Sequence, residues 1–326
     1  MINPSPVEAE ATEQLGSTRT SILAFMNSLP ASVPPTRGDL VLGFATGYKP
    51  QVIAPFVESV RRHGQFAGKI VLFIDSDAQD VADYLSRHDI EAIAFDPSKS
   101  AGAYINLARA FTYFEYLREQ WDSGAVFNQI LLTDIQDVIF QKPLFETPCE
   151  ELEFQLEDRT IGEDWFTRRA VEIVSGKEAL QALSPKTISC AGTVCGRAIG
   201  IFDYLAQKQL LALELPASAR STWGVDQGLH NYMLHAGLTR AATSKPNFTR
   251  VATLGLVRRS TLVYDANGRV ANSDGEISEI VHQWNRHRHL SKKICAAYLQ
   301  NSRHVRWRFW MATAHALRQL MFPPHE

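Results

Sequence analysis

Two carboxylates follow an aliphatic run in the segment ILLTDIQDVIFQ, residues 130–141, where a buried strand would end. A single aspartate in such a place commonly caps a helix or lies in a turn. Asp134 and Asp137, three positions apart, can instead converge on a hard divalent cation such as Mg²⁺ or Mn²⁺, which prefers oxygen ligands. Two arrangements stay open. Either both aspartates bind the ion, or one of them binds it while the other orients a ribose or a neighbouring arginine. Asp137 is favoured as the closer metal ligand, which gives Asp134 the mixed role.

The segments before these aspartates alternate between short apolar runs and amphipathic stretches, which is typical of strands joined by helices. The predicted strands lie within residues 39–48, 69–77, 91–96 and 128–134. Unbroken aliphatic strands linked by helices predict an α/β fold, with a mostly parallel, Rossmann-like central sheet and helices on both faces. Ligands of such sheets bind at the carboxyl ends of the strands, and Asp134 is predicted to lie at one of these ends.

The chain divides into three predicted parts. Residues 1–37 are expected to be a loosely ordered N-terminal segment, because prolines interrupt the chain just before the first strand. Residues 38–290 form the α/β domain, whose less regular second half, loop-rich from 216 to 282, is expected to complete the sheet and one side of a cleft. Residues 291–326 form a basic, amphipathic helical tail.

Composition predicts an ordinary globular protein. Of 326 residues 45% are hydrophobic and 21% charged, and the net charge of -2 gives no overall bias toward nucleic acid, so no nucleic-acid partner is expected. The four cysteines have neither zinc-site spacing nor the density of a disulfide scaffold, which favours a reducing compartment. The acidic start and the lack of a long apolar run predict a cytoplasmic protein.

Five segments, in this order, resemble the GT-A fold nucleotide-sugar glycosyltransferases, and glycosyltransferase family 8 in particular. RAFTYFEYL resembles the helix that carries a donor-facing arginine, and LLTDIQDVIFQKPLF resembles the strand end with the DxD metal motif. ISCAGTVCG resembles the strand with small residues beside the sugar, and WGVDQGLHNYMLH the acceptor-side segment. IVHQWNRHRHL resembles the late segment that supplies a histidine to the metal. The resemblance covers about residues 38–290, and the spacing D-x-x-D departs from the family's D-x-D.

The resemblance implies a role for each of several residues. It implies metal ligation by Asp134, Asp137 and His282, with Mn²⁺ or Mg²⁺ as the cofactor. The residues implied to bind the nucleotide sugar are Thr46, Gly47, Tyr48, Asp75, Arg109, Asp134, Gly192 and Arg286. Asp226 and Gln227 are implied to be catalytic, Asp226 by aligning or deprotonating the acceptor hydroxyl. Because imidazole must be neutral to bind a metal, activity is expected to fall as the pH drops through the range of His282, near 6.5 if unperturbed.

Each of these residues also has a structural explanation that stays open at this point. Residues 46–48 suit a plain strand-to-helix turn, and Asp75 or Asp226 can cap a following helix. Arg109 can be a solvated charge on its helix, and Arg286 one of several cations in a surface turn. His282 can be a satisfied or surface histidine.

The implied activity is transfer of a sugar from a nucleotide diphosphate sugar, a UDP-sugar in the first instance, to a carbohydrate or glycolipid hydroxyl, with retention of configuration. A haloacid dehalogenase-type phosphohydrolase is the first alternative, although it needs D-x-D. A non-catalytic sugar-binding protein on the same fold is the second. A dinucleotide-dependent oxidoreductase is disfavoured, because GFATGY lacks the G-x-G-x-x-G fingerprint.

The tail makes a separate prediction. Apolar residues recur at helical spacing from Trp307 to Met321, and the stretch from 303 to 318 carries four arginines and no acid. Docking of the tail on the domain is the first expectation. A peripheral contact with the inner face of a membrane, suited to a lipid-linked acceptor, is the alternative.

Overall fold

The computed structural model describes residues 6–30 and 38–298. The first part of the domain alternates strands and helices as predicted. The strands are β1 (Leu40–Phe44), β2 (Lys69–Ile74), β3 (Glu91–Ala94) and β4 (Gln129–Thr133). The helices are α2 (Pro50–Arg62), α3 (Gln79–Ser86) and α4 (Ile105–Asp122). Because β1 to β4 are mutually parallel, their carboxyl ends lie along one edge, where a strand-end aspartate can meet a ligand.

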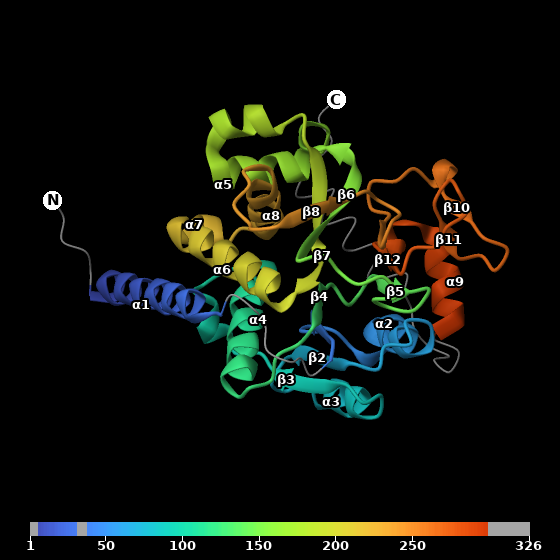
Figure 1. Ribbon diagram of the computed structural model, residues 1–326, viewed down its shortest axis with the longest axis horizontal. Helices are drawn as coiled ribbons and strands as arrows, with labels where there is room; N and C mark the ends of the chain where they lie inside the picture. The colour runs from blue at the N-terminus through green and yellow to red at the C-terminus, as the bar shows by residue number, and fades with distance from the viewer. Residues whose placement is uncertain (1–5, 31–37, 299–326) are drawn as a thin grey trace.

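The second half of the chain completes this sheet. The added strands are β6 (Leu152–Thr160), β7 (Thr187–Arg197) and β8 (Ala242–Lys245), and the order is β3-β2-β1-β4-β7-β6-β8. Strand β7 runs antiparallel to both of its neighbours, whereas β6 and β8 are parallel. The predicted α/β class and mostly parallel central sheet are therefore confirmed (Figure 1).

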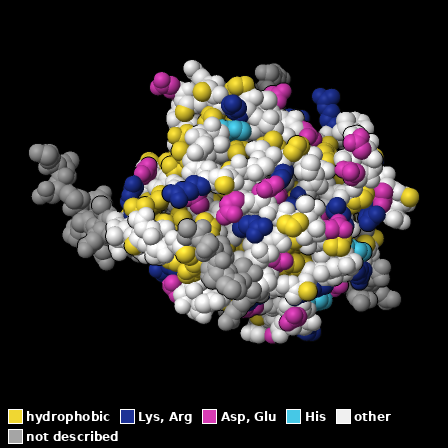
Figure 2. Space-filling view, viewed as in Figure 1, with side chains coloured by type: hydrophobic (Ala, Val, Ile, Leu, Met, Phe, Trp, Pro, Cys, Tyr) yellow, Lys and Arg dark blue, Asp and Glu magenta, His cyan; other side chains and the backbone are white. Residues whose placement is uncertain are grey.

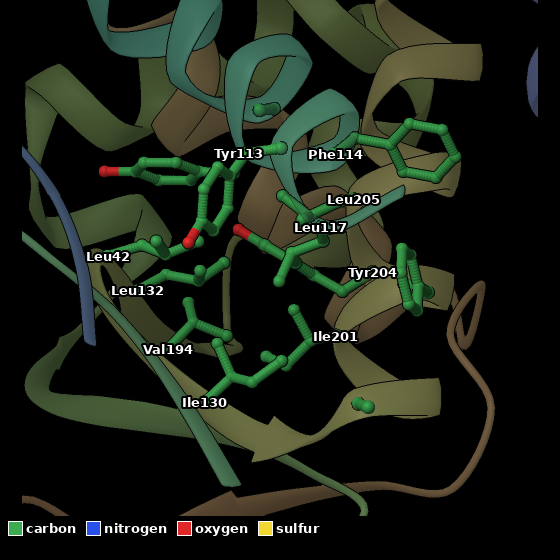
Figure 3. Packing of buried hydrophobic residues seen from close by; sticks show 14 of the residues in the cluster. Leu42, Tyr113, Phe114, Leu117, Ile130, Leu132, Val194, Ile201, Tyr204 and Leu205 are labelled. Carbon is green, nitrogen blue, oxygen red and sulfur yellow. The ribbon is translucent and has the colours of Figure 1, made fainter. Parts of the chain in front are cut away.

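Both faces of the sheet are covered, as unbroken apolar strands require. Successive residues of a strand point to opposite faces, so Leu42 packs toward α4 and α6 (Ala198–Glu214) while Val41 packs with Ile53 and Phe56 of α2. Figure 3 shows the α4–α6 side, where sheet residues Leu42, Ile130, Leu132 and Val194 meet Tyr113, Phe114, Leu117, Ile201, Tyr204 and Leu205. The two buried layers fix β4 and hence the place of Asp134.

A second, smaller sheet joins segments that are far apart in the chain. It has the order β5-β12-β9, with strands β5 (Val138–Phe140), β12 (Ile280–His282) and β9 (Val251–Thr253). Strand β5 begins one turn after β4, so this turn leads the chain from the central sheet into the small one. Figure 1 shows β5 and β12 near α2 and α9 (Arg288–Tyr298), on the right of the view.

The stretch from 216 to 282, expected to be loop-rich, also contains regular elements. They are helices α7 (Ala217–Arg220) and α8 (Val225–His235) and strands β8 to β12, including the hairpin β10 (Val263–Tyr264) and β11 (Val270–Ala271). The long helix α5 (Trp165–Leu183) was not predicted at all. Its weakly amphipathic sequence and the break at Gly176, where φ is 80°, hide the helical period.

The predicted N-terminal segment contains helix α1 (Pro6–Ser28), and part of it packs firmly on the domain. Ile22 and Phe25 are buried, and the ring of Phe25 lies 5.6 Å from that of Phe114 and 5.0 Å from that of Phe202. This part of residues 1–37 therefore differs from the loosely held segment that was expected, because its apolar side chains enter the core.

Helix α9 spans the predicted domain boundary near residue 290 and packs on the domain through Leu290 and Ile294. The rest of the predicted tail, from residue 299 onward, lies outside the described residues, as do the expectations made for it. Within the described residues, none of the helices is both long and apolar enough to span a bilayer. Acidic and basic side chains are interspersed on the face seen in Figure 2.

Candidate functional site

The turn between β4 and β5 presents two carboxylates at the carboxyl edge of the parallel strands. Asp134 directly follows β4, and its backbone N–H donates to the carbonyl of Gly192 on β7, 2.7 Å away. Asp137 directly precedes β5, and its carbonyl accepts from the N–H of Gln283, 2.8 Å away. The turn is thus tied on one side to the central sheet and on the other to the small sheet.

His282 reaches the same turn through the register of the small sheet. Strands β12 and β5 are antiparallel, and His282 lies opposite Val138, next to Asp137. The imidazole is fully buried, with Nε2 3.4 Å from Oδ2 of Asp134 and 3.6 Å from Oδ1 of Asp137. One ligand atom from each of the three residues lies within 4.8 Å of the others. The D-x-x-D spacing therefore brings both carboxylates to one point.

The protonation of His282 is set by its neighbours. Its Nδ1 lies 3.5 Å from Sγ of Cys190, while the buried Nε2 makes no hydrogen bond of acceptable geometry. Burial favours the neutral ring, but Cys190 and the two aspartates outweigh it and raise the pKa of His282 well above its ordinary value. A buried imidazole nitrogen without a hydrogen bond, facing two carboxylates, fits a divalent cation in place of the proton.

Gly192 on β7 leaves the room that this cluster needs. A Cβ built at this position would lie 2.5 Å from Oδ2 of Asp134 and 2.4 Å from Cε1 of His282. No side chain can occupy that space unless the cluster moves. Gly192 was expected to permit a close approach to the sugar, which stays a prediction, and the groups that lie against it in the structure are the candidate metal ligands.

Gln227 on α8 holds the strand that carries Gly192. Its Oε1 accepts from the N–H of Ala191 at 2.9 Å, and its Nε2 donates to the carbonyl of Ser189 at 2.8 Å. The amide of Asn231 adds two further hydrogen bonds to Ser189. These contacts make Gln227 a support for β7, and its expected catalytic role stays a prediction.

Arg109 lies between two carboxylates from different elements. One terminal nitrogen donates to Oδ1 of Asp134, and the other lies 3.4 Å from Oδ2 of Asp226. Although burial favours the protonated acid, Arg109 and His282 hold the pKa of Asp134 well below its usual range. Asp134 therefore contacts both Arg109 and His282, and its expected mixed role stays a prediction.

These groups line a cleft of about 420 Å³. The predicted residues that line it are Thr46, Tyr48, Arg109, Asp134, Asp137, Gly192, Asp226, Gln227 and Arg286. His282 lies just behind this lining, against Gly192.

Gly47 and Asp75 have a different place. Among the described residues that line the cleft, neither of them is found. The backbone N–H of Gly47 donates to Oδ2 of Asp75 at 2.6 Å, so this aspartate holds the turn after β1. For Gly47 and Asp75 the geometry therefore favours a structural role in the turn. Tyr48, the residue after Gly47, does line the cleft.

Several cleft residues were not singled out from the sequence: Glu157, Cys190, Phe166 and Trp223. Burial raises the pKa of Glu157 to about 7. A signal for Glu157 exists, because Glu153, Gln155 and Glu157 alternate along β6 and all three are buried. Buried polar residues at a strand period indicate a polar surface inside the protein.

No protein-family model matches the chain, and no curated protein matches it either. The α/β fold with its mostly parallel sheet stands on the structure itself. What the site does must therefore be inferred from its own geometry and chemistry.

Proposed function

We propose that this protein is a metal-dependent glycosyltransferase that moves a sugar from a nucleotide diphosphate sugar, a UDP-sugar in the first instance, to a hydroxyl of a carbohydrate or glycolipid. The observation that carries the proposal is the convergence of Asp134, Asp137 and His282 at the carboxyl edge of the sheet, beside a cleft. The resemblance of the strand-end segment to that of the GT-A enzymes agrees with it.

The donor diphosphate is anionic and needs positive charge around it. Asp134, Asp137 and His282 would hold Mn²⁺ or Mg²⁺, which would neutralise the charge that develops on the leaving diphosphate. Arg109 supplies a fixed cation on the same side, because its guanidinium is oriented by Asp134 and Asp226. Arg286 adds a second cation to the cleft lining.

The nucleoside of the donor is assigned to the wall formed by the turn between β1 and α2. Thr46 and Tyr48 line the cleft there, and the Tyr48 hydroxyl donates to Oε1 of Gln136 at 3.4 Å. Burial and the nearby aspartates raise the pKa of Tyr48, so its hydroxyl stays protonated and able to donate.

Asp226 is assigned to the acceptor. It is buried at the start of α8, and its Oδ2 lies 3.4 Å from a terminal nitrogen of Arg109. In the transfer, the bond from the sugar carbon C1 to the diphosphate oxygen breaks and a bond from C1 to the acceptor oxygen forms. The acceptor's proton passes to Asp226 or to the departing phosphate.

A donor panel tests the proposal. UDP-, GDP- and CDP-sugars are titrated calorimetrically with and without Mn²⁺, and product is sought by mass spectrometry with a mixture of simple glycosides. One nucleotide class should bind with Mn²⁺ and lose at least about tenfold in affinity with EDTA or in Asp137→Asn. Asp77→Asn is the matched control, because Asp77 is exposed and follows β2 outside the cleft lining.

Three results would contradict the proposal in different ways. If no nucleotide binds with any divalent ion while a phosphomonoester is hydrolysed, the site is that of a phosphohydrolase. If a sugar nucleotide binds but neither transfer nor hydrolysis follows, the protein is a sugar-binding protein without activity. If Asp137→Asn and Asp77→Asn bind the donor equally well, the ligand assignment is wrong.

A further inference from the structure

Two aromatic rings line a part of the cleft to which the proposed function assigns no role. Phe166, at the start of α5, and Trp223, just before α8, both line the cleft. Their ring centroids are 4.6 Å apart with an interplanar angle of 42°. Trp223 is 38% exposed, although a tryptophan side chain is more commonly buried. An apolar ring surface thus faces the cleft.

The backbone holds this aromatic pair in place. Gly224 has a φ of +88°, which favours glycine, and a Cβ built there would lie 2.5 Å from Cζ of Phe166. Phe166 lies in the first turn of α5, and Asp164 caps this helix by accepting from the N–H and the hydroxyl of Thr167, both at 2.8 Å. The backbone that carries each ring is therefore held in place, which lowers the entropy lost when a ligand stacks on the rings.

Polar groups line the same cleft as the rings. Asp226 follows Trp223 by three residues and belongs to the same helix start, and Arg109 contacts Asp226. Glu157 also lines the cleft. A cleft that combines an apolar ring face with a carboxylate and a guanidinium suits a pyranose ring, which has an apolar face of C–H groups and a polar edge of hydroxyls.

The aromatic pair and the wall assigned to the nucleoside belong to different elements. Figure 1 places α5 and α8 together at the top of the view, whereas α2, which follows the turn with Thr46 and Tyr48, lies in the lower part. A nucleoside at Thr46 and Tyr48 would leave the rings for another ligand. Of these aromatic residues, Trp223 lies nearest to Asp226 in the chain, three residues before it.

We infer that Phe166 and Trp223 form the acceptor subsite and that the acceptor is a pyranoside, stacked on Trp223 with a hydroxyl directed toward Asp226. This inference rests on the proposed function for the direction of transfer. The binding of a pyranoside to the rings is a separate statement that needs no donor turnover.

The test compares ring-containing and open-chain ligands on the full chain. Saturation-transfer NMR is run with methyl glucopyranosides, methyl galactopyranosides, maltose and lactose, and with sorbitol as an open-chain polyol, in the presence of UDP and Mn²⁺. We expect at least one pyranoside to bind and sorbitol not to bind. Trp223→Leu should weaken pyranoside binding about tenfold or more, whereas Trp223→Phe, which keeps an aromatic face, should weaken it less than about threefold.

A neighbouring tryptophan supplies the control. Trp165 is 40% exposed and packs on Phe166 with centroids 6.0 Å apart, yet it is not among the described residues that line the cleft. Trp165→Leu removes an exposed ring outside the cleft lining and should weaken pyranoside binding far less than Trp223→Leu does. UDP affinity should stay constant in all three variants, and unchanged near-ultraviolet circular dichroism would show that each variant is folded.

The outcomes separate this inference from the proposed function. Loss of UDP affinity in Trp223→Leu with intact pyranoside binding would overturn the inference and make the rings a base-stacking platform. Equal binding of sorbitol and the pyranosides, or no pyranoside binding by a protein that cleaves a donor, would also overturn it. If UDP does not bind at all but Trp223→Leu still abolishes a pyranoside signal, the subsite stands and the transferase proposal fails.

Discussion

Arg109 joins Asp134, at the end of β4, to Asp226, at the start of α8. One guanidinium contacts both carboxylates, and its side chain is only 14% exposed. The residue assigned to the metal and the residue assigned to the acceptor therefore share one cation. A change at Arg109 should disturb both ends of the cleft together.

Replacement of Arg109 tests this sharing. Arg109→Met removes the guanidinium that both carboxylates contact, and it should lower the free energy of unfolding by about 2 kcal/mol. This is less than the usual cost of breaking a buried ion pair, because Asp134 is one-third exposed to solvent. Donor affinity should fall by about tenfold or more. Arg109→Lys keeps the positive charge but cannot contact both carboxylates with two nitrogens. Its stability in urea unfolding and its donor affinity in calorimetry should lie between those of the parent and Arg109→Met. Equal stability of all three proteins would show that the bridge is unimportant.

The pH dependence of metal binding should reflect the raised pKa of His282. Without metal, the proton on His282 stabilises the folded protein at low pH, and this contribution is lost as the pH rises through the raised pKa. Mn²⁺ must displace that proton, so its affinity should increase with pH up to the same point, by up to about tenfold per pH unit. The raised pKa thus predicts that Mn²⁺ affinity levels off at a pH above 6.5, the value near which an unperturbed histidine titrates.

Electron paramagnetic resonance of free Mn²⁺ measures this dependence. His282→Gln should bind Mn²⁺ more weakly than the parent and with a flatter pH profile. A parent protein whose Mn²⁺ affinity is already constant above about pH 6.5 would contradict the raised pKa.

Gly192→Ala should close the site without removing a charged side chain. The added Cβ would overlap Asp134 and His282, so Mn²⁺ and donor affinities should both fall by about tenfold or more, while overpacking costs about 1–3 kcal/mol of stability. Gly16→Ala is a matched control, because a Cβ there, on α1, meets nothing within 4 Å. Unchanged Mn²⁺ affinity in Gly192→Ala would place the ion elsewhere.

Glu157 should make stability fall as the pH rises. Its pKa of about 7, raised from 4.5 by burial, means that the folded state holds the proton more tightly than the unfolded chain. Stability from this group is present below about 4.5 and is lost as the pH rises through 7, by roughly 3 kcal/mol. Glu157→Gln should therefore be more stable than the parent in alkaline urea unfolding with EDTA. The exposed Glu178→Gln should match the parent, and an identical pH slope in Glu157→Gln would refute the assignment.

A buried ionic cluster should hold the two sheets together. Arg250, just before β9, lies 2.9 Å from Glu153 of β6 and 2.8 Å from Glu279, just before β12, and all three side chains are buried. Arg250→Met should cost about 3 kcal/mol and weaken Mn²⁺ binding, because β12 carries His282. Arg269→Met, at a half-exposed pair with Asp265, should cost less than about 1 kcal/mol. Similar unfolding midpoints for the two variants would contradict this role.

The sequence predicted what depends on local pattern. The strands β1 to β4 are long and aliphatic and are flanked by helices, so their parallel pairing and the place of Asp134 followed from general rules. The metal-ligand role of His282 was implied by resemblance alone. Physical reasoning could not place it, because β5, β9 and β12 have three residues each and no periodic signal.

Other features were hidden for different reasons. The contact of Phe166 with Trp223 joins two helix starts far apart in the chain, and neither ring has a distinctive neighbour pattern in the sequence. The hydrogen bond from the Gly47 N–H to Asp75 can be predicted only once β1 and β2 are known to pair in parallel. Side-chain convergence of this kind is a property of the tertiary structure, not of local spacing.

The small sheet also has a consequence for synthesis of the chain. The parallel strands β1 to β4 and both aspartates leave the ribosome well before β12, whose pairing with β5 brings His282 to them. Until β12 has emerged, a nascent chain has the two carboxylates without the imidazole. If the site binds a metal as proposed, metal capture would be among the last steps of maturation. A chain truncated before β12 would contain every strand of the central sheet but would lack one of the three proposed ligands.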